Sequence, residues 1–280
     1  MREIDVSKIK DAVRDLCLKA NFVLRPDILK AIRKAASKES GPRAKSILRS
    51  IVENARIAKS KRIAICQDTG MVVVMAQIGQ EITIVGGSLI DAIEDGVREA
   101  YKIGCLRKSV VAGPLSRINT NTNTPSVIYT EIVKGDSLRI VASPKGFGSE
   151  NKSSIKMLNP TAGESDIRDF VLDTVKGAGP DACPPFVVGI GIGGTFEKCA
   201  YLAKKALMRP IDIRNLKKDI ARLEKELLKD INSLGIGPMG LGGKTTALGV
   251  NIEEFPTHIA GLPVAVNMSC HATRSAEEVI

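Results

Sequence analysis

The chain contains no tryptophan, and only 3% of its 280 residues are aromatic. Proteins that bind single-stranded nucleic acid stack the bases on aromatic side chains, so this shortage argues against that mode of recognition. The net charge of +10 is compatible with a nucleic acid, an acidic partner or an anionic substrate. Because the lysines and arginines are spread along the sequence, we interpret most of them as solvated helix faces. We therefore expect no nucleic-acid partner.

Long apolar segments are also missing. The longest apolar runs, residues 71–76 and 186–192, are far shorter than the roughly 20 residues that cross a bilayer. The N-terminus is charged from Arg2 onward, and no signal peptide is visible. Six cysteines without paired spacing are too few for a disulfide scaffold, which favours reduced thiols. We expect a cytoplasmic globular protein with no membrane segment.

Hydrophobic periodicity predicts an α/β protein in which mixed β-sheets are surrounded by helices. The N-terminal part, about residues 1–60, has helical spacing from Val6 onward, with new helices opening at Pro26 and after Pro42. From residue 62 the pattern changes to short runs rich in β-branched residues, which predict strands at 63–66 and 71–79.

The remaining elements alternate along the chain. Lys134-Gly135-Asp136 separates two strand-like runs and predicts a hairpin. The sequence shows no internal repeat and no low-complexity linker, so we expect one domain over residues 1–280. We predict helices at 88–103, 166–176, 195–208 and 212–234, and strands at 126–133, 137–143, 186–192, 247–252 and 263–268.

The surroundings of a cysteine indicate what its thiol does. A cluster ligand should lie on a polar or glycine-rich loop, whereas a structural thiol should lie on an apolar stripe. Cys17 and Cys199 lie on apolar helix faces, so we assign both to the core. Cys105 follows a helix-ending glycine and fits either interpretation.

Cys66, Cys183 and Cys270 each end an apolar run and are followed by Gln-Asp-Thr-Gly, Pro-Pro and His-Ala-Thr-Arg. Three separated thiolates could hold an iron–sulfur cluster and leave one iron without a protein ligand. Their spacing alone does not distinguish this from structural thiols, because no C-x-x-C pair is present. Zinc is less favoured, since its structural sites usually have paired ligands.

Two glycine-rich stretches imitate nucleotide motifs. Residues 189–194 match G-x-G-x-x-G, but two helices in succession follow them, where a βαβ unit needs a strand after the first helix. We favour close helix packing or an anion at the helix N-terminus. Residues 242–245 resemble a phosphate loop, but Pro238 occupies a position that requires glycine. Lys244 could still meet a carboxylate.

Several polar residues could perform acid–base work or bind a substrate. Asp68, two residues after Cys66, is well placed to be an acid or base. His258 and His271 are the only histidines, and a lone histidine is more often structural than catalytic. Candidates for binding dicarboxylate oxygens are Arg107, Arg117 and Lys145, although each could be an ordinary surface charge.

Six ordered motifs cover nearly the whole chain: ICQDTG, LRKSV with NTNTNTP, KGFGSENKS, ACPPF with GIGGT, FPTHIAG and the terminal cysteine. Together they resemble the class I, iron–sulfur-dependent fumarate hydratases. The length and the end ten residues past Cys270 resemble the separate alpha subunit of the two-subunit enzymes, or the closely similar alpha subunit of L(+)-tartrate dehydratase.

This resemblance implies an iron–sulfur hydro-lyase fold and a 4Fe-4S cluster held by Cys66, Cys183 and Cys270. The fourth iron would bind the hydroxyl and a carboxylate of a small dicarboxylate substrate. By the same resemblance, Asp68 and His258 form a catalytic pair. Phe147 and Glu150 depart from bacterial relatives, which often have smaller residues there. The residues that match substrate-contacting motifs are Gln67, Asp68, Arg107, Gly148, Asn151 and Lys152.

The resemblance further implies reversible hydration of fumarate to (S)-malate, a tricarboxylic acid cycle reaction. A separate beta subunit would complete the active site, and alpha–alpha association would give a heterotetramer. Alone, the chain should be inactive. One alternative is L(+)-tartrate dehydratase, which needs only small changes in the pocket. An alternative from another class is an iron–sulfur redox or sensor subunit, in which all four irons would have protein ligands.

Overall fold

Helices fill most of the first sixty residues of the computed structural model, which describes residues 2–280. They are α1 (Val6–Phe22), α2 (Pro26–Lys38) and α3 (Pro42–Lys61). Asp5 caps α1 by accepting a 2.8 Å hydrogen bond from the Ser7 N–H. Proline opens α2 and α3, where its missing N–H leaves no bond unmade. The helical N-terminal part is confirmed, although a short strand that the pattern did not predict, β1 (Arg2–Asp5), precedes it.

The chain forms two compact units. Unit 1 consists of Met1–Arg25, Asn54–Phe147 and Arg274–Ile280, and unit 2 of Pro26–Glu53 and Gly148–Thr273. The chain passes from one unit to the other at the start of α2, within α3, within the short helix α5 (Phe147–Glu150), and between Thr273 and Arg274. A single domain over residues 1–280 stays a prediction.

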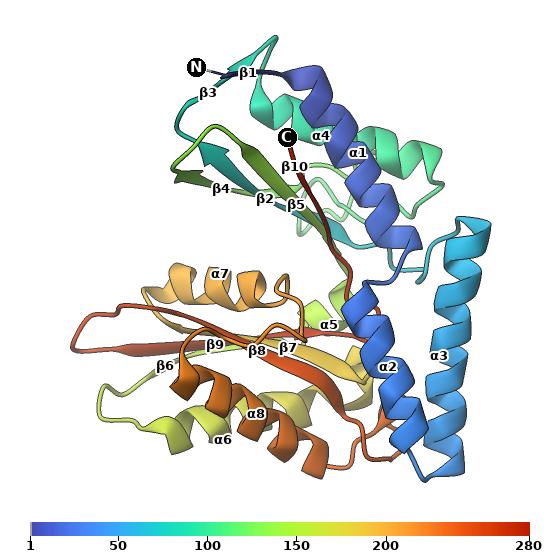
Figure 1. Cartoon of the computed structure of the whole chain (residues 1–280), viewed down its shortest axis with the longest axis vertical. Coiled ribbons are helices and arrows are strands. Elements are labelled where there is room, and N and C mark those ends of the chain that lie inside the picture. The colour runs from blue at the N-terminus through green and yellow to red at the C-terminus, as the bar shows by residue number, and fades with distance from the viewer. Residues whose placement is uncertain (1) are drawn as a thin grey trace. The chain divides into compact units, whose positions relative to one another are not determined.

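In unit 1, two helices cover one face of a four-stranded sheet (Figure 1). The helices are α1 and α4 (Leu89–Ile103), and α4 begins at the cap Ser88 and ends at Gly104, as predicted. Alternate strand residues point into the core beneath them, where Val72, Val74 and Ile140 are fully buried. In sheet order the strands are β10 (Ala276–Val279), β5 (Leu138–Lys145), β2 (Met71–Gly79) and β4 (Val127–Val133). A separate two-stranded sheet is formed by β1 and β3 (Ile82–Val85), which pair in parallel.

The predicted hairpin between β4 and β5 is wrong. Both strands exist, but β2 lies between them, parallel to β4 and antiparallel to β5. The segment that joins β4 to β5 instead bonds to the end of β2, where the Gly79 N–H donates to Ser137 at 2.9 Å and the Gln80 N–H to Val133 at 2.8 Å. A turn signal shows where the chain reverses, but long-range packing decides which strands pair.

Residues 63–66 also differ from the prediction, because they form no strand. The Ile65 N–H donates to the Asn21 carbonyl at 2.9 Å, and the Ile65 carbonyl accepts from the Asn54 side chain at 2.8 Å. These bonds satisfy the backbone that a sheet would otherwise pair. Cys66 therefore lies on an irregular segment between α3 and β2.

In unit 2, helices cover both faces of a second four-stranded sheet (Figure 1). α6 (Glu164–Ala178) and α8 (Lys218–Ser233) pack on one face, and α7 (Phe196–Ala206) packs on the other. In sheet order the strands are β6 (Ser154–Leu158), β9 (Leu262–Ser269), β7 (Phe186–Gly193) and β8 (Ala247–Phe255); two short 3-10 turns are η1 (Gly179–Ala182) and η2 (Pro238–Gly240).

The glycines of β7 allow α7 to approach the sheet closely. A Cβ on Gly189 would lie 2.3 Å from the Ala203 carbonyl oxygen, and one on Gly191 would lie 2.1 Å from that of Cys199. No side chain fits in this space. Close helix packing thus accounts for these two positions of the G-x-G-x-x-G pattern.

The predicted helix at 212–234 begins later, at Lys218. The Asn215 side chain accepts a 3.0 Å hydrogen bond from the Lys217 N–H, a local bond that competes with helix formation. Leu216, counted in the apolar stripe, is 99% exposed. From Ile220 to Ile231 the predicted stripe is buried against the sheet.

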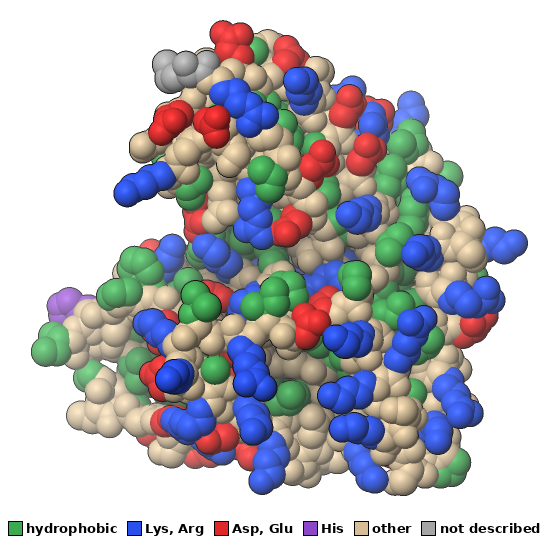
Figure 2. All heavy atoms as spheres, in the orientation of Figure 1, with side chains coloured by type: hydrophobic (Ala, Val, Ile, Leu, Met, Phe, Trp, Pro, Cys, Tyr) green, Lys and Arg blue, Asp and Glu red, His purple; other side chains and the backbone are tan. Residues whose placement is uncertain are grey.

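The surface agrees with the interpretation of the basic residues as solvated. Figure 2 shows lysine and arginine side chains spread over the visible surface of both units, with aspartate and glutamate among them. Arg168, for example, pairs with Glu226 at 2.6 Å and with Asp230 at 2.5 Å. Within residues 2–280, no helix is both long and apolar enough to cross a bilayer. Mixed sheets with helices around them confirm the predicted fold class.

Candidate active site

In unit 1, the backbone holds the Asp68 carboxylate from two sides. Oδ1 accepts a 3.0 Å hydrogen bond from the Gly70 N–H, and Oδ2 accepts a 2.8 Å bond from the Phe147 N–H. A Cβ on Gly146 would lie 3.0 Å from Oδ2, so glycine leaves room for the carboxylate. Asp68 is half-buried, and these bonds fix its orientation.

The segment around Asp68 rests on buried donors. The Tyr101 hydroxyl donates to the carbonyls of Thr69 at 2.5 Å and Gly70 at 3.0 Å, and the Asn123 side chain donates to Gly70 at 3.1 Å. Burial raises the pKa of Tyr101, which keeps its hydroxyl protonated as a donor. Residues 66–70 are thus held rigidly within unit 1.

Arg107 and Gln67 flank this segment. The Thr69 hydroxyl donates to the Arg107 carbonyl at 2.7 Å, and this bond places the backbone of the exposed Arg107 beside Thr69. The Gln67 side-chain oxygen lies 3.1 Å from the Cys66 sulfur. Arg117 lies farther along the loop after Arg107 and has a positive φ of 58°.

In unit 2, the segments of Cys183 and Cys270 adjoin. The Cys183 carbonyl accepts a 3.2 Å hydrogen bond from the His271 N–H and lies 3.1 Å from the His271 Nδ1. The Thr273 hydroxyl donates to the Cys270 carbonyl at 2.8 Å, which tightens that turn. Cys183 is exposed and Cys270 half-buried. Two of the three predicted ligands therefore lie on neighbouring polar turns.

The six cysteines are all thiols, and their burial separates them. Cys17 and Cys199 are fully buried, and burial raises the pKa of their thiols to about 12 and about 11. Neither thiol yields a thiolate easily, so both fit the predicted core role. Cys105 is exposed at the end of α4.

Cys66, half-buried on its irregular segment, and the two thiols of unit 2 have the accessibility that cluster ligands need. The donor chemistry of the trio fits an iron–sulfur cluster. Among residues 2–280, no group of three His, Cys, Asp or Glu side chains could hold a metal ion. The assignment of all three cysteines to one cluster stays a prediction.

Residues 148–153 of the KGFGSENKS motif, which belong to unit 2, lie close to the segment that leads to Cys183. Lys152 pairs with Asp181 at 2.7 Å, and Asp181 belongs to η1, two residues before Cys183. Gly148 on α5 and Asn151 after it are both exposed. Lys152 therefore contacts the turn that leads to Cys183, while substrate binding by these three residues stays a prediction.

Sequence reasoning missed a partly buried polar network that involves Glu150 of this motif. Glu150 forms an ion pair with Lys204 of α7, and its other oxygen accepts a 3.0 Å bond from Asn267 on β9. The Asn267 side chain also donates to Ser153 at 3.0 Å. Burial lowers the pKa of Lys204, although the charge of Glu150 opposes this shift. These contacts explain the presence of Glu150 by a structural role. The contacting residues are far apart in the sequence, so no local sequence signal predicts the network.

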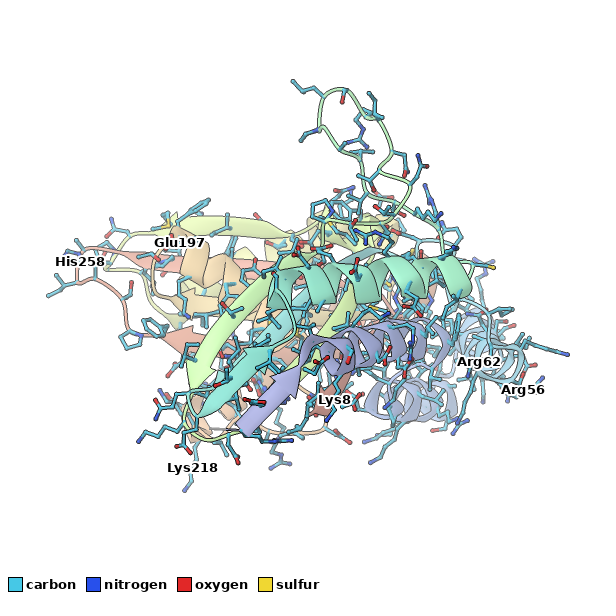
Figure 3. All side chains as sticks on the ribbon, turned by 90° about the horizontal axis from the view of Figure 1, so that it is seen from above. Lys8, Arg56, Arg62, Glu197, Lys218 and His258 are labelled. Carbon is cyan, nitrogen blue, oxygen red and sulfur yellow. The ribbon has the colours of Figure 1, made fainter. Side chains whose placement is uncertain are left out.

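The remaining candidates fall in different places. Lys145 is buried in unit 1, and its Nζ lies 3.4 Å from the Gly146 carbonyl. His258 is exposed on the loop between β8 and β9, where its Nδ1 accepts a 3.2 Å bond from the Ala260 N–H. In Figure 3 its side chain lies at the outer end of that loop.

His258 and Cys270 lie at opposite ends of β9, which runs from Leu262 to Ser269. At about 3.3 Å per residue, this strand separates them by about 25 Å. Within one chain, the structure does not bring His258 to the Cys183 and Cys270 turns.

Comparisons with known proteins cover nearly the whole chain. Residues 10–279 match the family model described as fumarate hydratase (fumerase). A Methanocaldococcus jannaschii protein provisionally named L(+)-tartrate dehydratase subunit alpha is 46% identical over 275 residues, which are 96% of each chain. The L(+)-tartrate dehydratase subunit alpha of Escherichia coli K12 is 30% identical over 273 residues, 96% of this chain and 89% of that one. The Shigella sonnei protein of the same name has the same identity and coverage.

Proposed function

Because the chain belongs to the fumarate hydratase (fumerase) family and is a hydro-lyase subunit, we propose that it adds water reversibly to fumarate to give (S)-malate. Its relatives are named as alpha subunits, which implies a separate beta subunit as partner. The observation that supports hydro-lyase chemistry is the family match over residues 10–279. A cytoplasmic location and a place in the tricarboxylic acid cycle stay predictions.

L(+)-tartrate is the second candidate substrate. The names of relatives at 46% and 30% identity favour it. Both substrates are four-carbon dicarboxylates that lose or gain water, so the same groups can serve either reaction. The choice depends on how the pocket meets one additional hydroxyl group.

Cys66, Cys183 and Cys270 would hold a 4Fe-4S cluster in this proposal. Their accessible thiols and the adjoining turns of Cys183 and Cys270 support the assignment. When bound, the cluster supplies an iron with an open coordination position, a Lewis acid for the substrate hydroxyl and carboxylate.

Asp68 would handle the proton of the substrate hydroxyl. Its carboxylate is oriented by the N–H groups of Gly70 and Phe147, and a carboxylate held in a fixed orientation suits a general acid or base. The beta subunit would remove the carbon proton.

The substrate carboxylates would be bound by Arg107 and Lys152, with Gln67, Gly148 and Asn151 as polar contacts. Lys152 is already paired with Asp181 at 2.7 Å. A substrate carboxylate could replace Asp181 as its partner, and the ammonium group would keep a counter-charge throughout. Arg107 can bind a carboxylate through two N–H groups at once.

His258 would act in the site of a second copy of the chain. The resemblance assigns it to the same site as Asp68, yet β9 separates it from Cys270 by about 25 Å within one chain. Alpha–alpha association would let the β8–β9 loop of one copy reach the cysteines of the other. In this arrangement the expected heterotetramer would be needed for catalysis, because each site would contain residues from two copies.

The test begins with anaerobic co-purification of the chain with a beta subunit, followed by iron counting and assays with malate and with L(+)-tartrate. Cys66→Ser should abolish activity and the brown absorbance together, whereas Cys105→Ser, at an exposed thiol outside the trio, should retain both. A colourless Cys66→Ser protein with full activity would contradict the assignment. If added dicarboxylates left the spectrum of the cluster unchanged, this result would favour the redox or sensor alternative.

The role of His258 is tested by mixing two inactive variants, Asp68→Asn and His258→Ala. In a mixed pair of copies, sharing between copies leaves one site with both native residues, so activity should return. If His258 acted within its own chain, every site would carry one substitution and the mixture would stay inactive.

A further inference from the structure

Arg274, four residues after Cys270, is a buried arginine that contacts the Asp68 segment. It belongs to unit 1 and is only 5% exposed. Its Nη2 donates to the Asp68 carbonyl at 2.8 Å, and its Nη1 donates to the Asn21 side-chain oxygen at 3.1 Å. Its own carbonyl accepts a 2.8 Å bond from the Ser143 hydroxyl. Both the backbone and the side chain of Arg274 are therefore fixed.

The charge of this guanidinium is not neutralised by an ion pair. Among residues 2–280, no carboxylate oxygen lies within 4.0 Å of it, and its side-chain partner Asn21 is a neutral amide. A buried cation without an ion pair is unfavourable for folding. Its retention therefore calls for a reason other than stability.

The guanidinium also lies near the Asp68 carboxylate. A single point, the Cβ position that Gly146 leaves empty, is 3.0 Å from Asp68 Oδ2 and 3.4 Å from Arg274 Nη2. The absence of a side chain at Gly146 lets the two groups face the same space. Arg274 thus bonds to the backbone of Asp68 and places a positive charge beside its carboxylate.

We propose that Arg274 is a positioning residue for Asp68: it anchors residues 66–70 and supplies the positive charge that the Asp68 carboxylate faces. This inference rests on the acid–base role of Asp68 in the proposed function. Asn21 orients the guanidinium, because its own Nδ2 is held by the Cys17 carbonyl at 3.0 Å. Because Asn21 is neutral, it does not cancel the positive charge of Arg274, and this charge can act on the Asp68 carboxylate.

Arg274→Ala and Arg274→Lys test the proposal in the complex with the beta subunit. We expect Arg274→Ala to lower kcat about 10- to 100-fold with little change in KM, the effect typical of groups that orient a reacting residue. Arg274→Lys should recover part of this loss, and added guanidinium should partly restore Arg274→Ala. The matched control is Arg25→Ala, which removes a 7% exposed arginine bonded to the neighbouring Ser275. Added guanidinium should not change the kcat of Arg25→Ala.

A second variant covers the case in which Arg274→Ala does not fold. Asn21→Asp keeps the hydrogen bond to Arg274 but adds a carboxylate that neutralises the guanidinium. The substitution gives up the bond from Asn21 Nδ2 to the Cys17 carbonyl, so circular dichroism first checks that the variant folds. If the charge of Arg274 acts on Asp68, kcat should then fall although Arg274 keeps its hydrogen-bond partner. Unchanged kcat in Asn21→Asp would overturn the electrostatic part of the proposal.

Amide hydrogen exchange in the cluster-free chain provides a readout that does not depend on activity. Loss of Arg274 should speed exchange at Gly70 and Phe147, whose N–H groups bond to Asp68, while Arg25→Ala should leave both rates unchanged. Native exchange and native kcat in Arg274→Ala would refute the positioning role. If the native complex lacks dehydratase activity, the proposed function fails, and the exchange measurement still tests the contact.

Discussion

Glu39 offers the sharpest test of how a buried carboxylate stabilises unit 2. It follows α2, is only 4% exposed, and accepts three backbone hydrogen bonds. Oε1 accepts from Ser40 at 2.9 Å and Gly41 at 3.0 Å, and Oε2 accepts from Lys244 at 2.8 Å. Glu39 therefore ties the α2–α3 turn to the glycine-rich segment before β8. Lys244 thus meets a carboxylate, but it does so through its backbone N–H.

Glu39→Gln should lower the free energy of unfolding by about 2–4 kcal/mol. The amide oxygen can still accept from Ser40 and Gly41, but its bonds lack the extra strength of a charged acceptor, and the amide NH2 faces the Lys244 N–H. Hydrogen bonds to charged groups contribute about 1.5–3 kcal/mol, and an unsatisfied buried donor costs about 1–3 kcal/mol. For a chain of this size, such a loss lowers Tm by about 5–10 °C.

The effect should depend on pH. Burial tends to raise the pKa of Glu39, but the N–H groups of Gly41, Lys244 and Ser40, with the charge of Lys244, outweigh it and hold the pKa below its ordinary value. A carboxyl group with a lower pKa in the folded state stabilises above its unfolded pKa, and this contribution disappears as pH falls through the folded pKa. The difference in the free energy of unfolding between the native chain and Glu39→Gln should therefore become smaller below about pH 4.

The assay is thermal and urea unfolding of both chains at pH 7 and at pH 3.5. Glu278→Gln makes the same chemical change at an exposed position on β10 and should leave Tm unaltered. An equal loss of stability at both pH values would refute the electrostatic argument. A Glu39→Gln protein as stable as the native chain would refute the role of the three hydrogen bonds.

Two further predictions concern packing and thiol accessibility. Gly191→Ala would put a methyl group 2.1 Å from the Cys199 carbonyl oxygen and should destabilise the chain by about 1–3 kcal/mol, as measured by urea unfolding. Gly177→Ala on α6, where a Cβ has nothing within 4 Å, is its control, and equal effects of the two would contradict the close-packing argument. In the cluster-free native chain at pH 8, a thiol reagent should modify the exposed Cys105 rapidly, but Cys17 only after unfolding. Mass mapping of the labelled peptides checks this, and rapid labelling of Cys17 would contradict its assignment to the core.

Local patterns predicted the helices and the core well. α4 was predicted from its apolar stripe and its terminating Gly104, because stripes and helix ends depend on residues close along the chain. The core roles of Cys17 and Cys199 followed from the same periodicity. Where a distant bond intervened, the pattern failed: the Asn215 side chain donates to the Ile252 carbonyl at 3.0 Å, and α8 begins only after it, at Lys218.

The candidate site was only partly readable from motifs. They gave Asp68 and Lys152 as candidates. They did not predict that the Phe147 N–H bonds to Asp68 or that Asp181 pairs with Lys152. Partners that lie tens of residues away leave no local signal. The position of His258, at the far end of β9 from Cys270, was equally invisible to the sequence.

The sequence by itself determined which segments are helical or extended, which cysteines lie on polar turns and which reaction class the motifs resemble. These properties depend on side chains that are close along the chain, so short patterns record them. Only the tertiary structure decided that β2 separates β4 from β5, that Glu150 pairs with Lys204, and that the buried Arg274 faces Asp68. Such contacts join residues far apart in sequence, and the competition among alternative packings of the whole chain selects them.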